Sequence, residues 1–178
     1  STPVVSSAAS DVYKRQVADY SIGFEHVVST PVEGLAAKFI IDIDIVVLSM
    51  NALLKVIERL VPLGYFHQRE LGIQGRHAFF QQENESKLHL YVCLDGSLGL
   101  RNHLALRDYL RAHPSAVKEY SNLKKQLAQQ YPNNIGCYAE RKTSFIASIL
   151  ERCSFTPCEL LNVVSSNKSP KAIIQSDP

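Results

Sequence analysis

The stretch KFIIDIDIVV, Lys38 to Val47, combines a strand-forming sequence with two acidic residues. Isoleucine and valine dominate it, and their branched side chains favour a β-strand. Because side chains alternate between the two faces of a strand, Asp42 and Asp44 share one face and lie about 7 Å apart. Isoleucines occupy the other face. Unpaired carboxylates are costly to bury, so the acidic face requires cations, hydrogen-bond donors or a metal ion.

The composition is that of an ordinary globular protein. The chain has 178 residues, 46% hydrophobic and 20% charged, which is enough for one domain with a core. A net charge of +2 is too small to indicate nucleic acid or an anionic membrane as a partner. No apolar run approaches the roughly eighteen residues of a membrane-spanning helix. The four cysteines form no CxxC pair and the six histidines do not cluster, so we expect free thiols in a reducing cytoplasm and no zinc site.

The two ends differ in character from the middle of the chain. The string SDVYKRQ, Ser10 to Gln16, resembles the in-frame translation of a transposon adaptor used in DNA library preparation. We therefore expect residues 1–16 to lie outside the fold and the native N-terminal sequence to be missing. Residues 153–178 contain SSNKSP and lose helical periodicity, which predicts a flexible tail. The predicted domain covers residues 17–152.

Strand patterns come first along this domain and helix patterns follow. The first predicted helix has Asn51 as its N-cap and ends at Pro62 and Gly64. A strand-rich half followed by helices predicts an α+β fold with a small mixed sheet rather than repeating βαβ units. The expected apolar face of the first helix holds Leu53, Leu54, Ile57, Leu60 and Val61. Strands are predicted near 22–28, 39–48, 64–68, 77–82 and 87–94, and helices near 51–63, 101–113, 114–131 and 136–152.

A small hydroxyl residue, Ser29, precedes the acidic strand in HVVSTPVEGLAAK. This segment predicts a strand, a tight turn and a short helix before D-x-D on the next strand. That order is suited to binding a phosphorylated ligand together with a metal ion. Backbone N–H groups of the turn and the helix start bind phosphate. Asp42 and Asp44 would hold Mg²⁺, which prefers oxygen ligands and can activate an attacking oxygen. The alternative is that both aspartates bond a neighbouring loop or pair with arginines, and the spacing alone does not decide between the two.

Basic side chains interrupt two apolar helical stripes. Lys142 and Arg107 each lie among apolar residues at helical spacing, and Arg76 follows a turn in GIQGRHAFF. The alternative for Lys142 is that it extends to water, and the alternative for Arg107 is an ion pair with Asp108 or a nearby glutamate. Our hypothesis is that basic residues opposite the aspartate strand bind the phosphates of a nucleotide or a CoA-like molecule. The candidates are Arg76, His89, Arg101, His103, Arg107 and Lys142.

Several segments resemble the GrpB family, over roughly residues 22–150. They are HVVSTPVEGLAAKFIIDIDIVV, GYFHQRELGIQGRHAFF, HLYVCLDGSLGLRNHLALRDYLRAHPSAVKEYSNLKKQLA and CYAERKTSFI, and within them HLYVC and RNHLALRDYLRAHP are the most specific. The resemblance implies the polymerase-β-like nucleotidyltransferase fold. The family also occurs fused to dephospho-CoA kinase in some bacteria.

The resemblance assigns roles to four residues. Ser29 and Thr30 match the serine and threonine of the family's phosphate-binding turn, and Asp42 and Asp44 match its acidic pair. They are therefore the expected phosphate-binding residues and the expected catalytic metal ligands, respectively. The resemblance implies a Mg²⁺-dependent nucleotidyltransferase that acts on a nucleoside triphosphate or another phosphorylated small molecule and an unknown acceptor.

The sequence departs from the family pattern at Val28, where glycine is expected, and at Glu33 and Phe39, where proline is expected. Valine resists the positive φ and the close approach to phosphate that glycine allows. Active nucleotidyltransferases also carry a third carboxylate, which is missing from the strand KLHLYVC. This strand offers His89 in its place, and Glu70 is a possible acidic neighbour from elsewhere in the chain. These departures favour the alternative of a non-catalytic module that binds a nucleotide or CoA-like ligand, or an interaction domain of a kinase partner. A third reading is an inactive fragment with an exposed apolar patch.

Overall fold

A computed structural model describes residues 13–27, 32, 35, 41–81 and 88–168. Five strands form one mixed sheet in the order β1-β2-β5-β4-β3. The central pair, β2 and β5, is parallel, and the other neighbours are antiparallel. The predicted α+β class and small mixed sheet are therefore confirmed. The strands are β1 (Gly23–Val27), β2 (Ile41–Val47), β3 (Tyr65–His67), β4 (Arg76–Gln81) and β5 (Leu88–Leu94).

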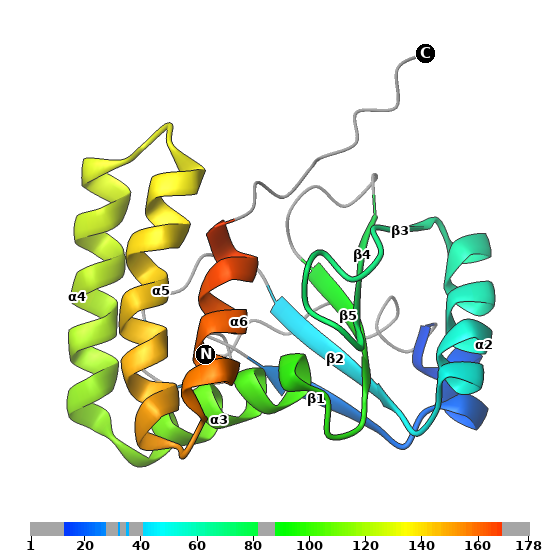
Figure 1. Ribbon diagram of the computed structural model, residues 1–178. Helices are drawn as coiled ribbons and strands as arrows, with labels where there is room; N and C mark the ends of the chain where they lie inside the picture. Colours follow the sequence, from blue (N-terminus) through cyan, green and yellow to red (C-terminus); the bar gives the residue numbers. More distant parts are fainter. Residues whose placement is uncertain (1–12, 28–31, 33–34, 36–40, 82–87, 169–178) are drawn as a thin grey trace.

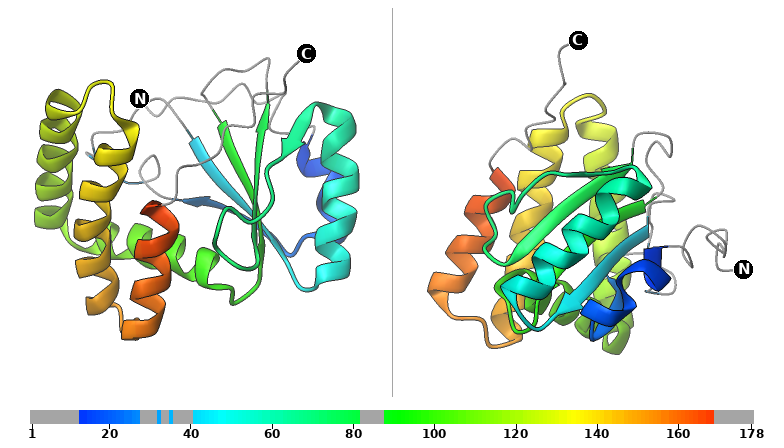
Figure 2. Two further views of the ribbon diagram at one scale, coloured as in Figure 1. Left: turned by 45° about the horizontal axis from the view of Figure 1, so that its top comes forward. Right: turned by 90° about the vertical axis from the view of Figure 1, so that its right-hand side faces the viewer.

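Helices cover both faces of the sheet. One face carries α2, whereas α3 to α6 lie on the opposite side, with α4 and α5 forming an antiparallel hairpin (Figure 1). The same separation is visible in the left view of Figure 2. None of the helices described here has the length and apolarity to cross a membrane. The helices are α2 (Met50–Leu60), α3 (Leu98–Ala112), α4 (Pro114–Gln130), α5 (Ile135–Arg152) and α6 (Pro157–Lys168), with short 3-10 helices η1 (Ala18–Tyr20) and η2 (Val61–Leu63).

The start and the buried face of α2 differ from the prediction. Ser49, not Asn51, is the N-cap: its side-chain oxygen accepts the Ala52 N–H at 3.2 Å. The residues that α2 buries completely are Leu53, Val56 and Leu60, at the i, i+3, i+7 spacing of one helical face. Leu54 and Val61, expected in the core, are 54% and 52% exposed because they project from the opposite side of the helix.

The two faces of the sheet are filled differently. On the α2 side, Ile45 and Val92 belong to a large apolar cluster that also includes the buried face of α2. On the other side, only a small apolar group joins the sheet to α3, with Tyr91 and Leu100 among its members. The α3–α6 helices bury most of their apolar residues among themselves. The face that bears the aspartates therefore keeps room for polar groups.

The C-terminal segment is not a flexible tail over its described part. Residues 157–168 form α6, and Phe155 and Val163 are buried among the helices. Thr156 and Glu159 form a capping box: the Thr156 N–H donates to the Glu159 carboxylate at 2.8 Å, and the Glu159 N–H donates to Thr156 Oγ1 at 3.3 Å. The sequence signal was therefore present in T-x-x-E. The remaining residues of the predicted tail, 169–178, lie outside the described part.

The adaptor-like segment also enters the fold. Residues 13–17 are helical, and Tyr13 is 1% exposed. Its ring lies edge-on to Tyr65 with centroids 6.4 Å apart. Expecting residues 13–16 to lie outside the fold was wrong, because Tyr13 supplies aromatic surface to the core on the α2 side. Residues 1–12 lie outside the described part.

Candidate functional site

The two aspartates of β2 lie on the sheet face that α3 covers. The register pairs Asp42 with His89 and Asp44 with Tyr91 on β5, and places Glu25 of β1 opposite Asp44. Paired residues project from the same face of a sheet. The alternation predicted from IDIDIVV therefore gathers a set of polar side chains from three neighbouring strands.

Asp44 is completely buried and is held by a histidine. His103 Nδ1, from α3, donates to the Asp44 carboxylate, with distances of 2.8 Å to Oδ2 and 3.1 Å to Oδ1. The edge of the Tyr91 ring packs on the imidazole, with centroids 5.4 Å apart. Burial raises the pKa of the Tyr91 hydroxyl. Asp44 thus has a hydrogen-bond donor in the interior, as a buried carboxylate requires.

Asp42 is the more accessible of the pair. Its Oδ1 lies 3.0 Å from His89 Nδ1, and the two side chains are 14% and 43% exposed, respectively. One carboxylate oxygen of Asp42 is engaged by this contact, and a carboxylate accepts several hydrogen bonds or metal bonds. Both aspartates therefore have histidine partners, and no arginine of the described residues forms an ion pair with either of them.

Two lysines of the α4–α5 hairpin lie near each other, and one of them, Lys124, lies within electrostatic reach of Asp42. Burial and the nearby charge of Lys142 together lower the pKa of Lys124 to about 8, with the Asp42 carboxylate acting in the opposite direction. The Lys124 ammonium lies 4.9 Å from the centroid of Tyr120, and Lys142 lies 5.7 Å from that of Tyr138. A lysine whose charge is disfavoured by burial and by a second lysine is in an environment that a bound anion would stabilise.

Arg76 adds a third cationic group to this face of the sheet. Its residue exposure is 8%, and its guanidinium lies over the Tyr91 ring at 5.1 Å from the centroid. Gly99 of α3 makes room for it, since a Cβ there would approach Arg76 Cβ to 2.8 Å. The Nε atom is buried without a hydrogen-bond partner, and no carboxylate in the described part of the chain forms an ion pair with Arg76.

Two other predicted arginines are engaged elsewhere. Arg107 lies on the aspartate face, but its guanidinium donates to Glu25 at 2.6 Å and to Asp108 at 2.7 Å, and these bonds raise its pKa. The ion-pair alternative is therefore what the structure shows. Arg101 points to α6, where it bonds Glu159 at 2.6 Å. The Thr156 N–H and this arginine lower the pKa of Glu159 to about 2.

Of the remaining predicted residues, Glu70 does not join the group. Glu70 accepts the Gly75 N–H at 2.8 Å and lies 3.6 Å from His77, so it closes a turn rather than completing an acidic triad. Ser29 and Thr30, with Val28 beside them, lie outside the described residues. Their role as a phosphate-binding turn stays a prediction.

A metal would have few protein ligands here. Within residues 13–27, 32, 35, 41–81 and 88–168, no three His, Cys, Asp or Glu side chains gather in a metal-binding group. Asp44 has both oxygens within hydrogen-bonding distance of His103, which leaves Asp42 as the accessible carboxylate. Mg²⁺ commonly binds through one or two carboxylates, with substrate phosphates and water completing its shell. The residues present fit that mode, and they do not fit an all-protein metal site.

The sequence reasoning missed Lys124. It follows Tyr120 by one helical turn and lies between Leu123 and Leu127 of the apolar stripe of α4. The rule that selected Lys142, a lysine at helical spacing among the apolar residues of one stripe, would have found it.

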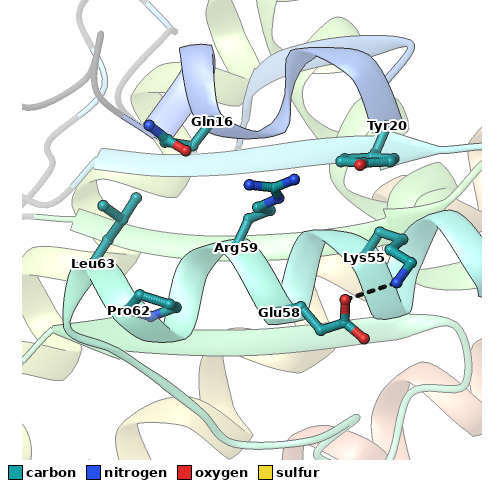
Figure 3. Close-up of a pocket in the computed structure, with 7 residues that line it drawn as sticks. All are labelled: Gln16, Tyr20, Lys55, Glu58, Arg59, Pro62 and Leu63. Atoms are coloured by element: carbon teal, nitrogen blue, oxygen red, sulfur yellow. Dashed lines mark hydrogen bonds and ion pairs between the residues drawn. The ribbon is translucent and has the colours of Figure 1, made fainter.

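Two surface hollows lie on the other side of the molecule, beside α2. The larger, of about 450 Å³, is shown in Figure 3 and contains the exposed Lys55–Glu58 ion pair of 2.9 Å. The second, of about 390 Å³, lies near Ser49 and Ile22. Neither hollow is lined by an aspartate of β2, so both are separate from the polar face.

Comparison with known proteins identifies a family. Residues 6–152 match the family model described as GrpB protein. The chain is 40% identical over 130 residues to UPF0157 protein YqkA of Bacillus subtilis. This match covers 73% of this chain but only 38% of YqkA. It is 39% identical over 127 residues to glutamate-rich protein GrpB of Alkalihalophilus pseudofirmus, covering 68% of this chain and 73% of that protein. The crystal structure of conserved protein GrpB from Enterococcus faecalis superposes with a TM-score of 0.71 at 28% identity, covering 83% of this chain and 91% of that one.

Proposed function

The chain belongs to the GrpB family, and on this premise we propose that it binds a nucleoside triphosphate or a similar phosphorylated small molecule between the aspartate face of the sheet and the α4–α5 hairpin. The observation that carries the proposal is Lys124. A half-buried lysine whose pKa falls to about 8 beside a second lysine is in an environment that a bound polyanion would stabilise.

Three groups would hold the ligand. Lys124 of the hairpin lies within electrostatic reach of Asp42 and of Lys142. Arg76 lies over the Tyr91 ring on the aspartate face and forms no ion pair with a carboxylate of the described residues. A buried guanidinium without an anionic partner costs free energy, which phosphate oxygens would recover through charge-assisted hydrogen bonds.

Mg²⁺ is part of the proposal. Asp42 would hold the ion together with phosphate oxygens and water, and the ion would neutralise phosphate charge when bound. Asp44 is hydrogen-bonded to His103, so it would hold that histidine in position rather than bind the ion. Asp44 would bind the ion only if His103 moved away. The two aspartates therefore have different expected roles in the described arrangement.

The candidate reaction is nucleotidyl transfer to an acceptor hydroxyl. The acceptor oxygen would bond to the α-phosphorus, the α–β anhydride bond would break, and pyrophosphate would leave. The hydroxyl proton would pass to His89 or to water. His89 has the reach for this role, since it is exposed and hydrogen-bonded to Asp42 at 3.0 Å.

A non-catalytic binding module is the second candidate. It is favoured by His103, which occupies both oxygens of Asp44 and so withholds one of the two carboxylates that the reaction uses. Such a module would bind the same nucleotide without releasing pyrophosphate.

Calorimetric titration with ATP, with and without Mg²⁺, tests the binding proposal. We expect Lys124→Met to weaken ATP binding at pH 7 by about tenfold, as a lost charge-assisted contact does. Asp42→Asn should remove the Mg²⁺ dependence. Asp95→Asn is the matched control, because Asp95 is exposed and lies in the turn after β5. Absence of ATP binding by the folded native protein would contradict the proposal. Pyrophosphate release in the presence of cell-extract acceptors separates the enzyme from the module.

A further inference from the structure

We infer that Phe66 and Phe80 form a stacking platform for the base of the bound nucleotide, so that the ligand is aromatic as well as phosphorylated. This inference rests on the proposed function. It assigns a binding surface to the base, the part of the ligand that the charged groups do not recognise. The two rings lie on the same sheet face as the aspartates, at the opposite edge.

The strand register places the platform in line with Asp42. Phe66 of β3 pairs with Phe80 of β4, and His89 of β5 pairs with Asp42 of β2. Phe79 pairs with Leu90, so the same antiparallel register brings the next residue, Phe80, level with His89. One transverse row of the sheet therefore runs Phe66, Phe80, His89, Asp42, and all four side chains project from one face.

The Asp42 end of this row is covered, and the other three side chains are partly exposed. The Asp42 side chain is 14% exposed and that of His89 is 43% exposed, whereas Phe80 and Phe66 are exposed by 37% and 48% as residues. The hydrogen bonds of α3 fall on other rows, at Asp44 and Glu25. The end of the row that carries the rings is thus open to a ligand, and Lys124 lies within electrostatic reach of the end that carries Asp42.

The two rings are preordered. Their centroids lie 5.0 Å apart with an interplanar angle of 23°, so they form one stacked pair on neighbouring strands. Aromatic rings held by strands offer a fixed surface on which a base stacks with little loss of side-chain freedom. Stacking of this kind tolerates different bases, because each base has a π-face.

The length of the row matches a nucleotide. Neighbouring strands lie about 4.8 Å apart, so Phe80 on β4 is about 10 Å from Asp42 on β2, and Phe66 is about 14 Å away. A ligand with phosphates at Asp42, Lys124 and Lys142 would place its base over the rings. A phosphorylated ligand without an aromatic group would leave them exposed.

A protein partner is a poorer occupant of this surface. Two aromatic side chains bury at most about 500 Å² together, whereas a stable interface needs about 800 Å² on each partner. The row also continues into charged groups at His89 and Asp42 rather than into further apolar surface. A nucleotide, which has an aromatic end and an anionic end, fits both properties.

Three probes test the platform: ATP, adenosine and inorganic tripolyphosphate, each titrated by calorimetry. In Phe66→Ala/Phe80→Ala we expect ATP and adenosine to bind about tenfold more weakly, with tripolyphosphate binding unchanged, since stacking on an aromatic ring typically contributes about that much per base. Phe66→Leu/Phe80→Leu keeps apolar bulk and removes the rings, and it should show the same loss. Leu54→Ala is the control, because Leu54 is equally exposed at 54% but lies on α2, across the sheet.

The outcomes separate the platform from the nucleotide site. Unchanged ATP binding by both double variants, or equal losses for ATP and tripolyphosphate, would overturn the platform and leave the phosphate site standing. If the native protein bound tripolyphosphate at least as tightly as it bound ATP and adenosine, the ligand would not be a nucleotide. If no probe bound, the platform would fall with the proposed function. A native dimer that the double variants convert to monomer, measured by sedimentation, would make this face a self-association surface instead.

Discussion

The two faces of the sheet come from the same strands but differ in what holds them to the helices. On the α2 side, Ile45, Val92 and their neighbours form a continuous apolar core. On the α3 side, the contacts at β1 and β2 are largely polar: Asp44 with His103, and Glu25 with Arg107. The first arrangement gives stability through burial, and the second retains charged groups that bind or react. Substitutions on the two faces should therefore fail in different ways.

The largest effect is expected on the apolar face. Leu53→Ala should lower the free energy of unfolding by about 3–4 kcal/mol, because Leu53 is 0% exposed and its loss leaves a cavity. Urea denaturation measures the change. Leu54→Ala, one position along α2 but 54% exposed, should change stability by less than about 0.5 kcal/mol. Equal losses would mean that α2 does not bury the face described here.

Removing a polar partner on the other face should have a somewhat smaller effect. Asp44→Ala leaves His103 buried without its carboxylate, and we expect a loss of about 3 kcal/mol in the free energy of unfolding. His103→Ala added to it should cost little more, because the partner is already lost. Additive losses in this double-mutant cycle, again measured in urea, would show that the two side chains are not coupled.

The contrast also explains which parts were predictable from the sequence. The alternation in IDIDIVV placed Ile45 on one face and Asp44 on the other, and the strands and most helices were predicted near their observed positions. Of the residues assigned to the apolar face of the first helix, Leu53 and Leu60 are buried and Ile57 packs against the core. Leu54 and Val61 are apolar yet exposed. Apolar composition alone does not fix the rotation of a helix.

The partners of the aspartates could not be predicted. His89 lies 47 residues from Asp42 along the chain, and the pairing of β2 with β5 brings them together. His103 lies 59 residues from Asp44 and reaches it because α3 covers this face of the sheet. Arg107 shows the same limit, because its partner Glu25 is 82 residues away. Pairing across a parallel β2–β5 neighbour depends on long-range topology that local patterns do not contain.

The pH dependence of stability should reveal Lys124. Burial lowers its pKa to about 8 from 10.5, so between these pH values the unfolded chain binds more protons and stability rises with pH. Below pH 8, the free energy of unfolding of the Lys124→Met variant should therefore be about 1–2 kcal/mol higher than that of the native protein. The difference should shrink as pH rises through that window. Lys125→Met, an exposed neighbour, should show no such trend. A pH-independent difference would mean that Lys124 titrates normally.

The smallest effect is expected for the charges on the α2 side. The Lys55–Glu58 pair of 2.9 Å lies in the hollow of Figure 3, with side chains 44% and 62% exposed. Exposed pairs are screened by water and contribute little, although the bond to Glu58 raises the pKa of Lys55. Lys55→Met should thus leave both the urea midpoint and the ATP affinity unchanged within replicate scatter. Weaker ATP binding in this variant would move the anion site to the α2 face, because a lysine on that side has no contact with the polar row of β2 and β5.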